Sequence, residues 1–319
     1  MKAFIHTQYG PPEVLQLSEL PKPVPGNHEI LIRIYATTVN RTDDGFLRPI
    51  PFITRFFIGL FKPKNKTLGS EFAGRVEATG KEVTLFKTGD NVFGFSGFGT
   101  HAEYITLSEQ SNVATIPEGW TFSEAAPLTE GSHYALNNIR KANIQPDQKV
   151  LLYGATGAIG SAALQILKAI GAEVTAVCNT KNVDLIQSLG ADRVIDYRAE
   201  DFTETDQMYD VVFDAVGKCS FKQCKPLLKK NGIYMSTELG PYNQNPFLAM
   251  FTPMFGGKKV LFPIPSIDKE MIQYLRDLAQ SGAFKPVIDR EYPFEQIPEA
   301  FNYVHTGQKT GNVVISLSD

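Results

Sequence analysis

The segment from Lys149 to Gly160 reads KVLLYGATGAIG and predicts a β-strand, a glycine-rich turn and the start of a helix. The predicted helix carries apolar residues at helical spacing, on the face that would pack against a sheet: Ile159, Ala162, Ala163, Ile166, Leu167 and Ile170. A strand, a glycine-rich turn and a helix in this order are typical of a dinucleotide-binding βαβ unit. The alternative, a tight turn made of small residues with no ligand, is weaker in this context.

Three small residues in the turn stand at the positions that a dinucleotide requires. Ala155 allows the tight turn, Gly157 leaves room for the pyrophosphate, and Gly160 lets the helix approach the strand. The phosphates would lie on the helix N-terminus, where free N–H groups and the helix dipole favour an anion. We therefore predict that the cofactor contacts Ala155, Thr156, Gly157, Ala158, Ile159 and Gly160.

The end of the next predicted strand indicates which nicotinamide cofactor is bound. An NAD enzyme usually places Asp or Glu there to bind the ribose hydroxyls. In this chain the strand from Glu173 to Cys178 is followed by Asn179, Thr180 and Lys181. A neutral amide, a hydroxyl and an ammonium can accept a 2′-phosphate, so NADPH is favoured over NADH. Solvation of Lys181 at a helix start is the alternative.

Composition excludes several classes of protein. The chain has 319 residues with 31 Lys and Arg against 34 Asp and Glu, a formal net charge of −3, which disfavours nucleic-acid binding. The 43% of hydrophobic residues can form a large core. Two uncharged stretches, 150–167 and 239–257, are interrupted by glycine or proline, so no stable membrane insertion is expected. Three cysteines and no expected export signal favour a cytoplasmic location.

The pattern of residues changes along the chain and predicts two domains. The first hundred residues combine short β-rich runs with frequent proline and glycine, and residues after 123 alternate strand and helix patterns. Past Gly282 the β-rich pattern returns and ends in Asn312–Leu317, which could pair with the first domain. We predict an α/β protein with a β-rich domain over 1–122 and 284–319 and a doubly wound parallel sheet over 123–283.

Ordered motifs over essentially the whole chain carry a family resemblance. They include Val39–Asp43, Gly69–Gly74, Lys87–Phe93, Gly99–Tyr104, Leu189–Asp192, Asp210–Gly217 and Gly307–Val314, together with the glycine-rich turn. With them the sequence resembles the medium-chain dehydrogenase/reductase superfamily, and within it the zinc-independent quinone oxidoreductase (zeta-crystallin-like) group. The resemblance implies a GroES-like β-rich domain and a Rossmann dinucleotide-binding domain.

Three positions at which zinc-dependent members of the superfamily have metal ligands differ in this chain. Those members resemble one another in Cys, His and Cys, and this chain has Asn40, Ser70 and Thr129 there. None of these side chains is a thiolate or imidazole ligand, so no metal is expected. Without a Lewis acid, hydride transfer to a quinone or to a carbonyl-conjugated alkene is easier than to an unactivated ketone.

The resemblance also implies roles for individual residues. Asn40, Asp43 and Thr129 would lie at the nicotinamide end of the site; Lys181 and Tyr197 would contact the 2′-phosphate side; and Val216, Gly217 and Leu239 would follow the ribose and nicotinamide. Asn312 stands where relatives often have a basic residue near the phosphate. Tyr134 is a candidate proton donor, with water as the alternative. Caps of a turn or helix are the alternative role for Asn40 and Asp43.

The segment from Pro49 to Lys66, PIPFITRFFIGLFKPKNK, combines four phenylalanines with four basic residues and no acid. Three interpretations compete: an aromatic wall or lid over an apolar substrate, an amphipathic helix packed on the core, and a weak contact with a membrane surface. In the first, Phe52, Phe56 and Phe57 form part of a substrate pocket.

Two hypotheses of function follow. The chain is either a zinc-independent, NADPH-dependent reductase of quinones, enones or enals, or an NADPH-binding structural or sensing protein with little catalysis. The apolar, β-prone run from Lys259 to Ile264 predicts an exposed edge strand, and we expect it to pair with its twin in a homodimer.

Overall fold

A computed structural model describes residues 1–318, which form two compact units. Of the described residues, the first unit contains 1–130, 267–282 and 286–318, and the second contains 131–266 and 283–285. The first unit is therefore built from separate parts of the chain. Its boundaries differ from the expected ones, because the helix over residues 269–280 belongs to the first unit and not to the second.

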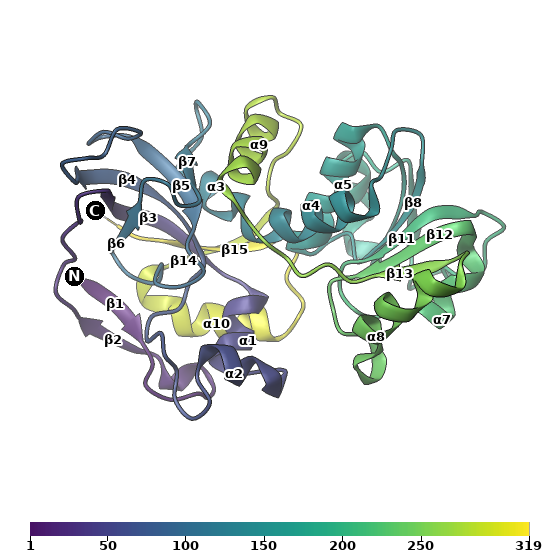
Figure 1. The fold of residues 1–319 in the computed structure, drawn as a ribbon, viewed down its shortest axis with the longest axis horizontal. Helices are drawn as coiled ribbons and strands as arrows, with labels where there is room; N and C mark the ends of the chain where they lie inside the picture. Colours follow the sequence, from purple (N-terminus) through teal and green to yellow (C-terminus); the bar gives the residue numbers. More distant parts are fainter. Residues whose placement is uncertain (319) are drawn as a thin grey trace. The chain divides into compact units, whose positions relative to one another are not determined.

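The first unit is organised around a seven-stranded sheet (Figure 1). Its path is β14-β15-β3-β4-β5-β7, and β6 pairs with β3. Strand β15, near the C-terminus, pairs antiparallel with β3, so residues from both ends of the chain share this sheet. The strands are β3 (Glu29–Val39), β4 (Glu71–Thr79), β5 (Asn91–Phe95), β6 (Tyr104–Ser108), β7 (Val113–Thr115), β14 (Ile288–Pro293) and β15 (Asn312–Ser316); β1 (Lys2–Ile5) and β2 (Gln16–Glu19) form a separate pair.

The helices of the first unit are short, except for two. They are α1 (Arg41–Leu47), α2 (Arg55–Ile58), α3 (Phe122–Ala125), α9 (Lys269–Gln280) and α10 (Ile297–His305). Alternate residues of β3, such as Ile32 and Ile34, are buried with Phe72 of β4 and Phe301 of α10 in one hydrophobic core. This core fixes the ends of β3 and β4, where the polar residues described below begin.

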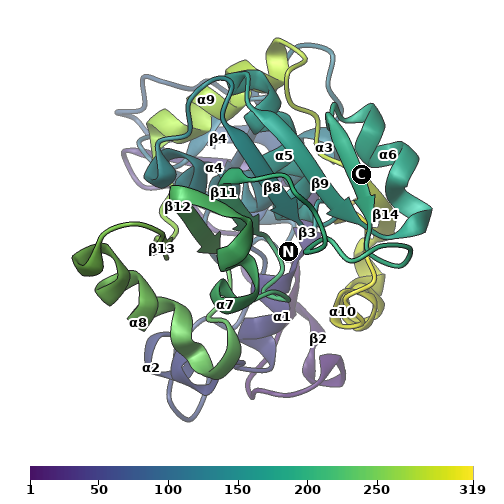
Figure 2. The same ribbon diagram turned by 90° about the vertical axis from the view of Figure 1, so that its right-hand side faces the viewer.

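The second unit contains a six-stranded parallel sheet in the order β10-β9-β8-β11-β12-β13. Figure 2 shows β8, β9, β11 and β12 of this sheet running side by side. Its strands are β8 (Lys149–Tyr153), β9 (Glu173–Cys178), β10 (Arg193–Asp196), β11 (Tyr209–Asp214), β12 (Leu228–Ser236) and β13 (Lys259–Leu261). The strand order reverses between β8 and β11, and open parallel sheets bind ligands at such a point.

Helix α4 (Glu130–Ala142), whose first residue belongs to the first unit, precedes β8. The helices between the strands of this sheet are α5 (Ala158–Ile170), α6 (Val183–Ser188), α7 (Phe221–Cys224) and α8 (Gln244–Phe251). The predicted strand, turn and helix over residues 149–170 are all present. The predicted fold class, a GroES-like β-rich domain with a Rossmann-type parallel sheet, is confirmed.

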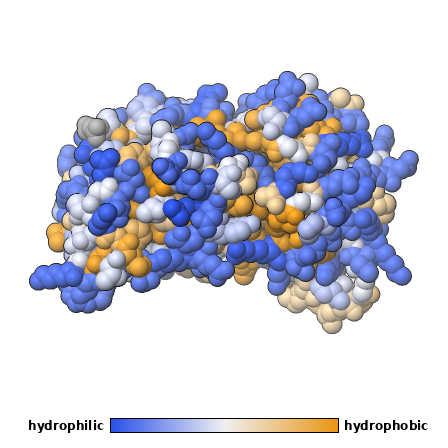
Figure 3. Space-filling view, turned by 90° about the horizontal axis from the view of Figure 1, so that it is seen from above, coloured by the Kyte–Doolittle hydropathy of each residue, from blue (hydrophilic) through white to orange (hydrophobic). Residues whose placement is uncertain are grey.

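Hydrophobic side chains are exposed mainly in two segments, residues 50–61 and 242–255. The face drawn in Figure 3 is mostly hydrophilic, with hydrophobic side chains in separate patches. Among residues 1–318 there is no helix with the length and apolar character needed to cross a bilayer.

Candidate functional site

The glycine-rich turn between β8 and α5 depends on two glycines for its shape. Gly154 has φ +79°, and a Cβ there would lie 2.6 Å from Val216 Cγ1. A Cβ on Gly160 would lie 2.1 Å from the Gly154 carbonyl oxygen, much closer than atoms can approach. Gly160 therefore brings helix α5 against the end of β8, as the spacing of the fingerprint predicts.

Gly157 has a different role, because nothing lies within 4 Å of the position that its Cβ would occupy. It is the N-cap of α5, and no side chain caps this helix. The first N–H groups of this 13-residue helix thus have no side-chain cap, and the space where a side chain at position 157 would stand is open. Open space beside these groups and the positive end of the helix dipole fit a pyrophosphate, so residues 155–160 can hold a dinucleotide.

The end of β9 presents polar and basic groups, as the sequence predicts. Asn179 Oδ1 accepts a hydrogen bond from Asn182 Nδ2 at 2.8 Å, and the Lys181 side chain is exposed. Asp196, at the end of β10, pairs in register with Cys178. Hydrogen bonds from the Thr180 hydroxyl and the Arg198 backbone N–H lower the pKa of Asp196. The Asp196 carboxylate is thus engaged by neighbours, and Lys181 offers an exposed positive charge at the β9 end.

Tyr197 follows β10 and lines a groove of about 390 Å³. Tyr197 is 45% exposed, and its ring centroid lies 6.5 Å from that of Tyr153 and 6.0 Å from the Arg198 guanidinium carbon. Glu200, Asp201 and Phe202 lie along the same groove. An aromatic face beside an arginine offers a flat surface on which a purine base could stack.

Asp214, at the end of β11, organises the next loop. Its carboxylate accepts hydrogen bonds from the backbone N–H groups of Val216 (3.1 Å), Gly217 (2.8 Å) and Cys219 (3.0 Å). Gly217 has φ +68°, and a Cβ there would lie 2.4 Å from Glu238 Cβ, so this loop packs closely on the one after β12, which contains Leu239. Sequence reasoning quoted Asp214 in a motif but assigned it no role.

In the first unit, Asn40 and Asp43 form a capping box at the start of α1. Asn40 Oδ1 accepts from the Asp43 backbone N–H at 2.9 Å, and Asp43 Oδ2 accepts from the Asn40 N–H at 3.2 Å. Asp43 also accepts from the Gly69 N–H and has no exposed surface. Both residues therefore have the capping role named as the alternative, and their predicted place at the nicotinamide end of the site stays a prediction. Asn40 Nδ2 donates to Ser70 Oγ at 2.8 Å.

Glu71 is the centre of a buried polar cluster in the first unit. Its Oε1 accepts from Thr38 Oγ1 at 2.7 Å, and its Oε2 accepts from Thr129 Oγ1 at 2.8 Å. The backbone N–H groups of Thr129 and Glu130 also donate to Oε2. Glu130 Oε1 in turn accepts from Thr42 Oγ1 at 2.6 Å. The sequence predicts Thr129 at the site, but it did not predict that Glu71 and Glu130 lie together there.

Burial changes the acidity of this cluster. Loss of water around the carboxyl and the nearby charge of Glu130 raise the pKa of Glu71 to about 7. Burial raises the pKa of Glu130 to about 7 and that of Asp43 well above its usual range. Burial also lowers the pKa of Lys309 to about 8, against the opposite effect of Asp289. The cluster can therefore exchange protons near neutral pH.

The three positions at which zinc-dependent members of the superfamily have metal ligands carry hydrogen-bonding groups in this chain. Asn40 bonds to Ser70, and Thr129 bonds to Glu71. Within residues 1–318 no group of three or more His, Cys, Asp or Glu side chains is arranged to hold a metal ion. An amide and two hydroxyls are poor ligands for zinc, so this donor set does not fit a catalytic zinc site.

Other predicted site residues lie elsewhere. Tyr134 is on α4 in the second unit, with its ring centroid 4.4 Å from that of His133. Asn312 is the first residue of β15 in the first unit and is 6% exposed. Its Nδ2 donates to the Val287 carbonyl at 3.0 Å. One N–H of the Asn312 amide is therefore engaged by the backbone, and its predicted contact with the cofactor stays a prediction.

The aromatic segment after α1 is not packed on the core. Phe52, Phe56 and Phe57 are 63%, 64% and 76% exposed, so the interpretation as a core-packed helix is wrong. Their predicted role in a substrate pocket stays a prediction, since exposed side chains can cover a substrate as a lid. Only two short turns form here, a 3₁₀ turn over Phe52–Thr54 and α2.

Comparison with known proteins relates both units to the same set of oxidoreductases. Residues 26–118 match the family described as alcohol dehydrogenase GroES-like domain, and residues 189–315 match that described as zinc-binding dehydrogenase. A 2-methylene-furan-3-one reductase from Solanum lycopersicum is 33% identical over 99% of this chain and 79% of its own. A chloroplastic quinone-oxidoreductase from Triphysaria versicolor is 32% identical over 93% of this chain and 92% of its own.

Two further comparisons point the same way. An NADPH-dependent alkenal/one oxidoreductase from Arabidopsis thaliana is 29% identical over 99% of this chain and 79% of its own. The solved structure of the quinone oxidoreductase from Coxiella burnetii superposes with a TM-score of 0.86 at 26% identity, covering 100% of this chain and 99% of that one.

Proposed function

Because the chain belongs to the medium-chain dehydrogenase/reductase superfamily, among its quinone oxidoreductase-like members, we propose that it is a zinc-independent, NADPH-dependent reductase of quinones or α,β-unsaturated carbonyls. Its relatives are named oxidoreductases and quinone or enone reductases. The observation that carries the proposal is the open space at Gly157, beside the uncapped start of α5.

When bound, NADPH supplies a hydride, which adds to the quinone or to the β-carbon of the conjugated alkene, and a proton completes the reduction. The chain supplies binding and orientation. The Asn40 amide carries two N–H groups, of which one is given to Ser70, so the other can donate to the carbonyl oxygen of the acceptor. Thr129 is held by Glu71 next to this pair of residues in the first unit. Tyr134 is the proposed proton donor, with water as the alternative.

Lys181 is the proposed determinant for NADPH over NADH. Its exposed ammonium stands at the end of β9, and the carboxylate of Asp196 at the end of β10 is engaged by Thr180 and Arg198. Loss of this charge in Lys181→Ala should raise the dissociation constant for NADPH about tenfold and leave that for NADH unchanged. Lys222→Ala, which removes another exposed lysine from the same unit, is the matched control. An equal loss for both cofactors would contradict the assignment.

Turnover is the direct test of the proposal. We would measure NADPH oxidation in the presence of a chelator with a short α,β-unsaturated ketone, the matched aldehyde and a 1,4-quinone, each repeated with NADH. The proposal expects turnover that survives chelation and prefers NADPH. If NADPH binds but no acceptor is reduced, the alternative of a structural or sensing NADPH-binding protein replaces it. If turnover requires added zinc, metal independence is wrong.

Assembly and location are also proposals. β13 is an edge strand of the six-stranded sheet, and we propose that it pairs with its twin in a homodimer. A monomeric mass by light scattering would contradict this. The three cysteines are free and buried, which is compatible with the proposed cytoplasmic location. Several relatives are chloroplastic, so fractionation of the source cells is the test.

A further inference from the structure

The segment from residue 50 to residue 66, which we call the basic aromatic segment, exposes an unusual amount of apolar surface. Isolated exposed apolar residues are common on proteins, but a contiguous group marks a contact surface. The exposed fractions are Ile50 64%, Phe52 63%, Ile53 60%, Phe56 64%, Phe57 76%, Leu60 41% and Phe61 84%. None of the proposed catalytic or cofactor contacts involves these side chains.

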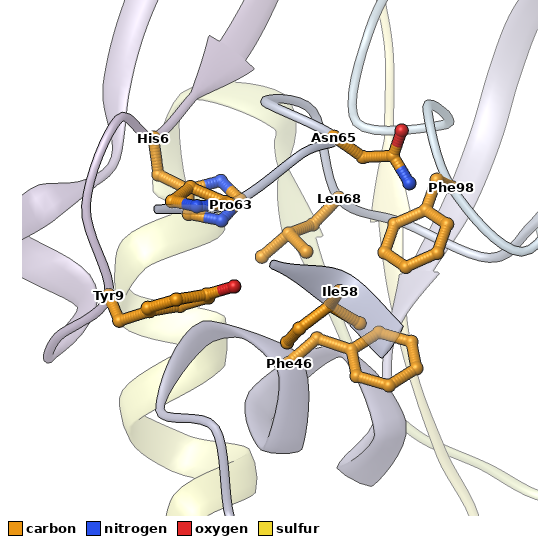
Figure 4. A pocket seen from close by; sticks show the side chains of 8 residues that line it. All are labelled: His6, Tyr9, Phe46, Ile58, Pro63, Asn65, Leu68 and Phe98. Carbon is orange, nitrogen blue, oxygen red and sulfur yellow. The ribbon is translucent and has the colours of Figure 1, made fainter. Parts of the chain in front are cut away.

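The segment is anchored so that these side chains face outward. Ile58 is buried and lines a cavity of about 10 Å³, roughly the space of one water, together with Phe46, Leu68 and Phe98 (Figure 4). Tyr9 points into the same region in Figure 4, and its hydroxyl donates to the Gly59 carbonyl at 2.6 Å.

Three further features fix the turn after α2. The Lys64 N–H donates to the Ile58 carbonyl at 2.8 Å, and the Arg55 guanidinium lies 4.9 Å from the centroid of the Tyr9 ring. Gly59 has φ +125°, and a Cβ there would lie 2.0 Å from the Lys62 carbonyl oxygen. The turn is therefore tight and is fixed by contacts with Tyr9 and within residues 58–64. The exposure of Phe56 and Phe57 is thus a feature of the folded protein.

The charge of the segment is of one sign. Between Asp44 and Glu71 the sequence has no acidic residue, and it has five basic ones: Arg48, Arg55, Lys62, Lys64 and Lys66. Arg48 is paired with Asp44 at 2.8 Å. The lysines at 62, 64 and 66 are exposed and alternate along the chain directly after Phe61. Apolar side chains and a group of cations thus occupy the same short stretch.

The second exposed apolar segment, residues 242–255, lacks this charge. It exposes Phe247 and Phe255 to 62% and 84%, but no charged residue occurs from Tyr242 to Gly257. Its helix α8 is connected to the edge strand β13 by a hydrogen bond from the Val260 N–H to Thr252 Oγ1 at 2.9 Å. Apolar surface alone therefore does not distinguish the two segments, whereas positive charge does.

We propose that the basic aromatic segment docks the protein on an anionic lipid bilayer. Aromatic side chains insert at the level of the headgroups, and lysines and arginines are attracted to anionic lipids. Contact is peripheral, because the segment has only a 3₁₀ turn and the four-residue α2, too short to lie in the interface as an amphipathic helix. Phe56, Phe57 and Phe61 enter the interface, and Lys62, Lys64 and Lys66 contact the headgroups. The proposal is independent of the reductase activity.

Vesicle flotation with the full chain tests the proposal. Vesicles of phosphatidylcholine are compared with vesicles in which about a third of the lipid is phosphatidylglycerol. We expect binding to the anionic vesicles that weakens with added salt. Phe56→Ser with Phe57→Ser should lower the partition coefficient at least about tenfold. Lys62→Gln with Lys64→Gln and Lys66→Gln should remove the preference for anionic vesicles.

Matched controls test whether the loss of any exposed phenylalanine or lysine would lower vesicle binding. Phe247→Ser with Phe255→Ser, and Lys81→Gln with Lys87→Gln, remove equally exposed side chains elsewhere and should leave vesicle binding unchanged. Thermal unfolding and NADPH binding show that each variant is folded. The proposal is overturned if wild type does not float with anionic vesicles, or if the phenylalanine controls lower binding equally. It is also overturned if Phe56→Ser with Phe57→Ser changes only the mass by light scattering, because a second copy would then cover the segment.

Discussion

The glycine-rich turn of the second unit and the acid cluster of the first unit are built in opposite ways. The turn offers backbone N–H groups and open space, and its key residue, Gly157, contributes no side chain. The cluster consists of buried side chains, with Glu71 accepting four hydrogen bonds from Thr38, Thr129 and Glu130. The turn can therefore donate hydrogen bonds to an anionic ligand, whereas the cluster consists of acidic side chains that accept hydrogen bonds from their own neighbours.

The difference has an energetic consequence. Exposed N–H groups at a helix start are solvated by water, so the turn has little cost when no ligand is bound. Carboxylates without water around them are destabilised unless they are protonated or hydrogen-bonded. The acid cluster should therefore make stability depend on pH, whereas substitutions in the turn should act on packing or on cofactor binding.

The largest expected effect is that of Glu130→Gln on the pH dependence of stability. The pKa of Glu130 rises from 4.5 to about 7 on folding, so the folded state binds the extra proton and wild type loses stability as pH rises through this window. Glutamine keeps an oxygen for Thr42 and does not titrate. The free energy of unfolding of the variant relative to wild type should increase by about 3 kcal/mol between about pH 4.5 and 7.

Urea unfolding at several pH values measures this difference. Glu118→Gln, at an exposed glutamate of the same unit, is the control and should give a difference that does not change over the window. A flat difference for Glu130→Gln would mean that the carboxyl titrates normally in the folded protein.

Gly160→Ala should have the next largest effect, on stability alone. The new Cβ would lie 2.1 Å from the Gly154 carbonyl oxygen, and moving α5 away from β8 should cost about 3 kcal/mol. Alanine recovers about 1 kcal/mol through its helix propensity, so a net loss of about 2 kcal/mol is expected in denaturant unfolding.

Gly157→Ala is the matched test of the same turn. Its Cβ meets no atom within 4 Å, so stability should change by less than about 0.5 kcal/mol. The methyl group would fill the space expected for the pyrophosphate and should weaken NADPH binding about tenfold in a titration. Equal destabilisation by both alanines would refute the separate roles of the two glycines.

The sequence predicted the turn because its signal is local. Small residues at 155, 157 and 160, followed by apolar residues at helical spacing, specify the strand, the turn and the helix within one short stretch. The glutamate cluster has no such signal, since Thr38, Glu71 and Thr129 are brought together only by the pairing of β3 with β4 and by the chain before α4. Their distance along the chain hides the contact.

The aromatic segment shows a different limit. Phenylalanines at helical spacing favoured a core-packed helix, but Gly59 and the bond from Tyr9 end α2 after four residues. The spacing of apolar residues predicts burial only where the chain continues as a helix and a core lies beside it. Asn312 shows a related limit, since its position in a motif does not reveal that the Val287 carbonyl accepts a hydrogen bond from its amide.

The smallest expected effect distinguishes a hydrogen-bonding role of Thr129 from a catalytic one. In Thr129→Val the bond from Oγ1 to Glu71 is lost, while the bond from the backbone N–H at 3.1 Å can remain. Stability at neutral pH should fall by about 1 kcal/mol, and the pKa of Glu71 should rise further, because this bond favours its charged form. Thr129→Ser keeps the donor and should restore both properties.

Steady-state kinetics separate the two roles of Thr129. If Thr129 also contacts the acceptor, Thr129→Val lowers kcat/KM and Thr129→Ser retains it. If its role is structural alone, Thr129→Val changes the unfolding curves and the pH dependence of stability, and the steady-state kinetics at neutral pH stay as in wild type. At Gly157 a structural and a catalytic role of a side chain need not be separated, because glycine has no side chain.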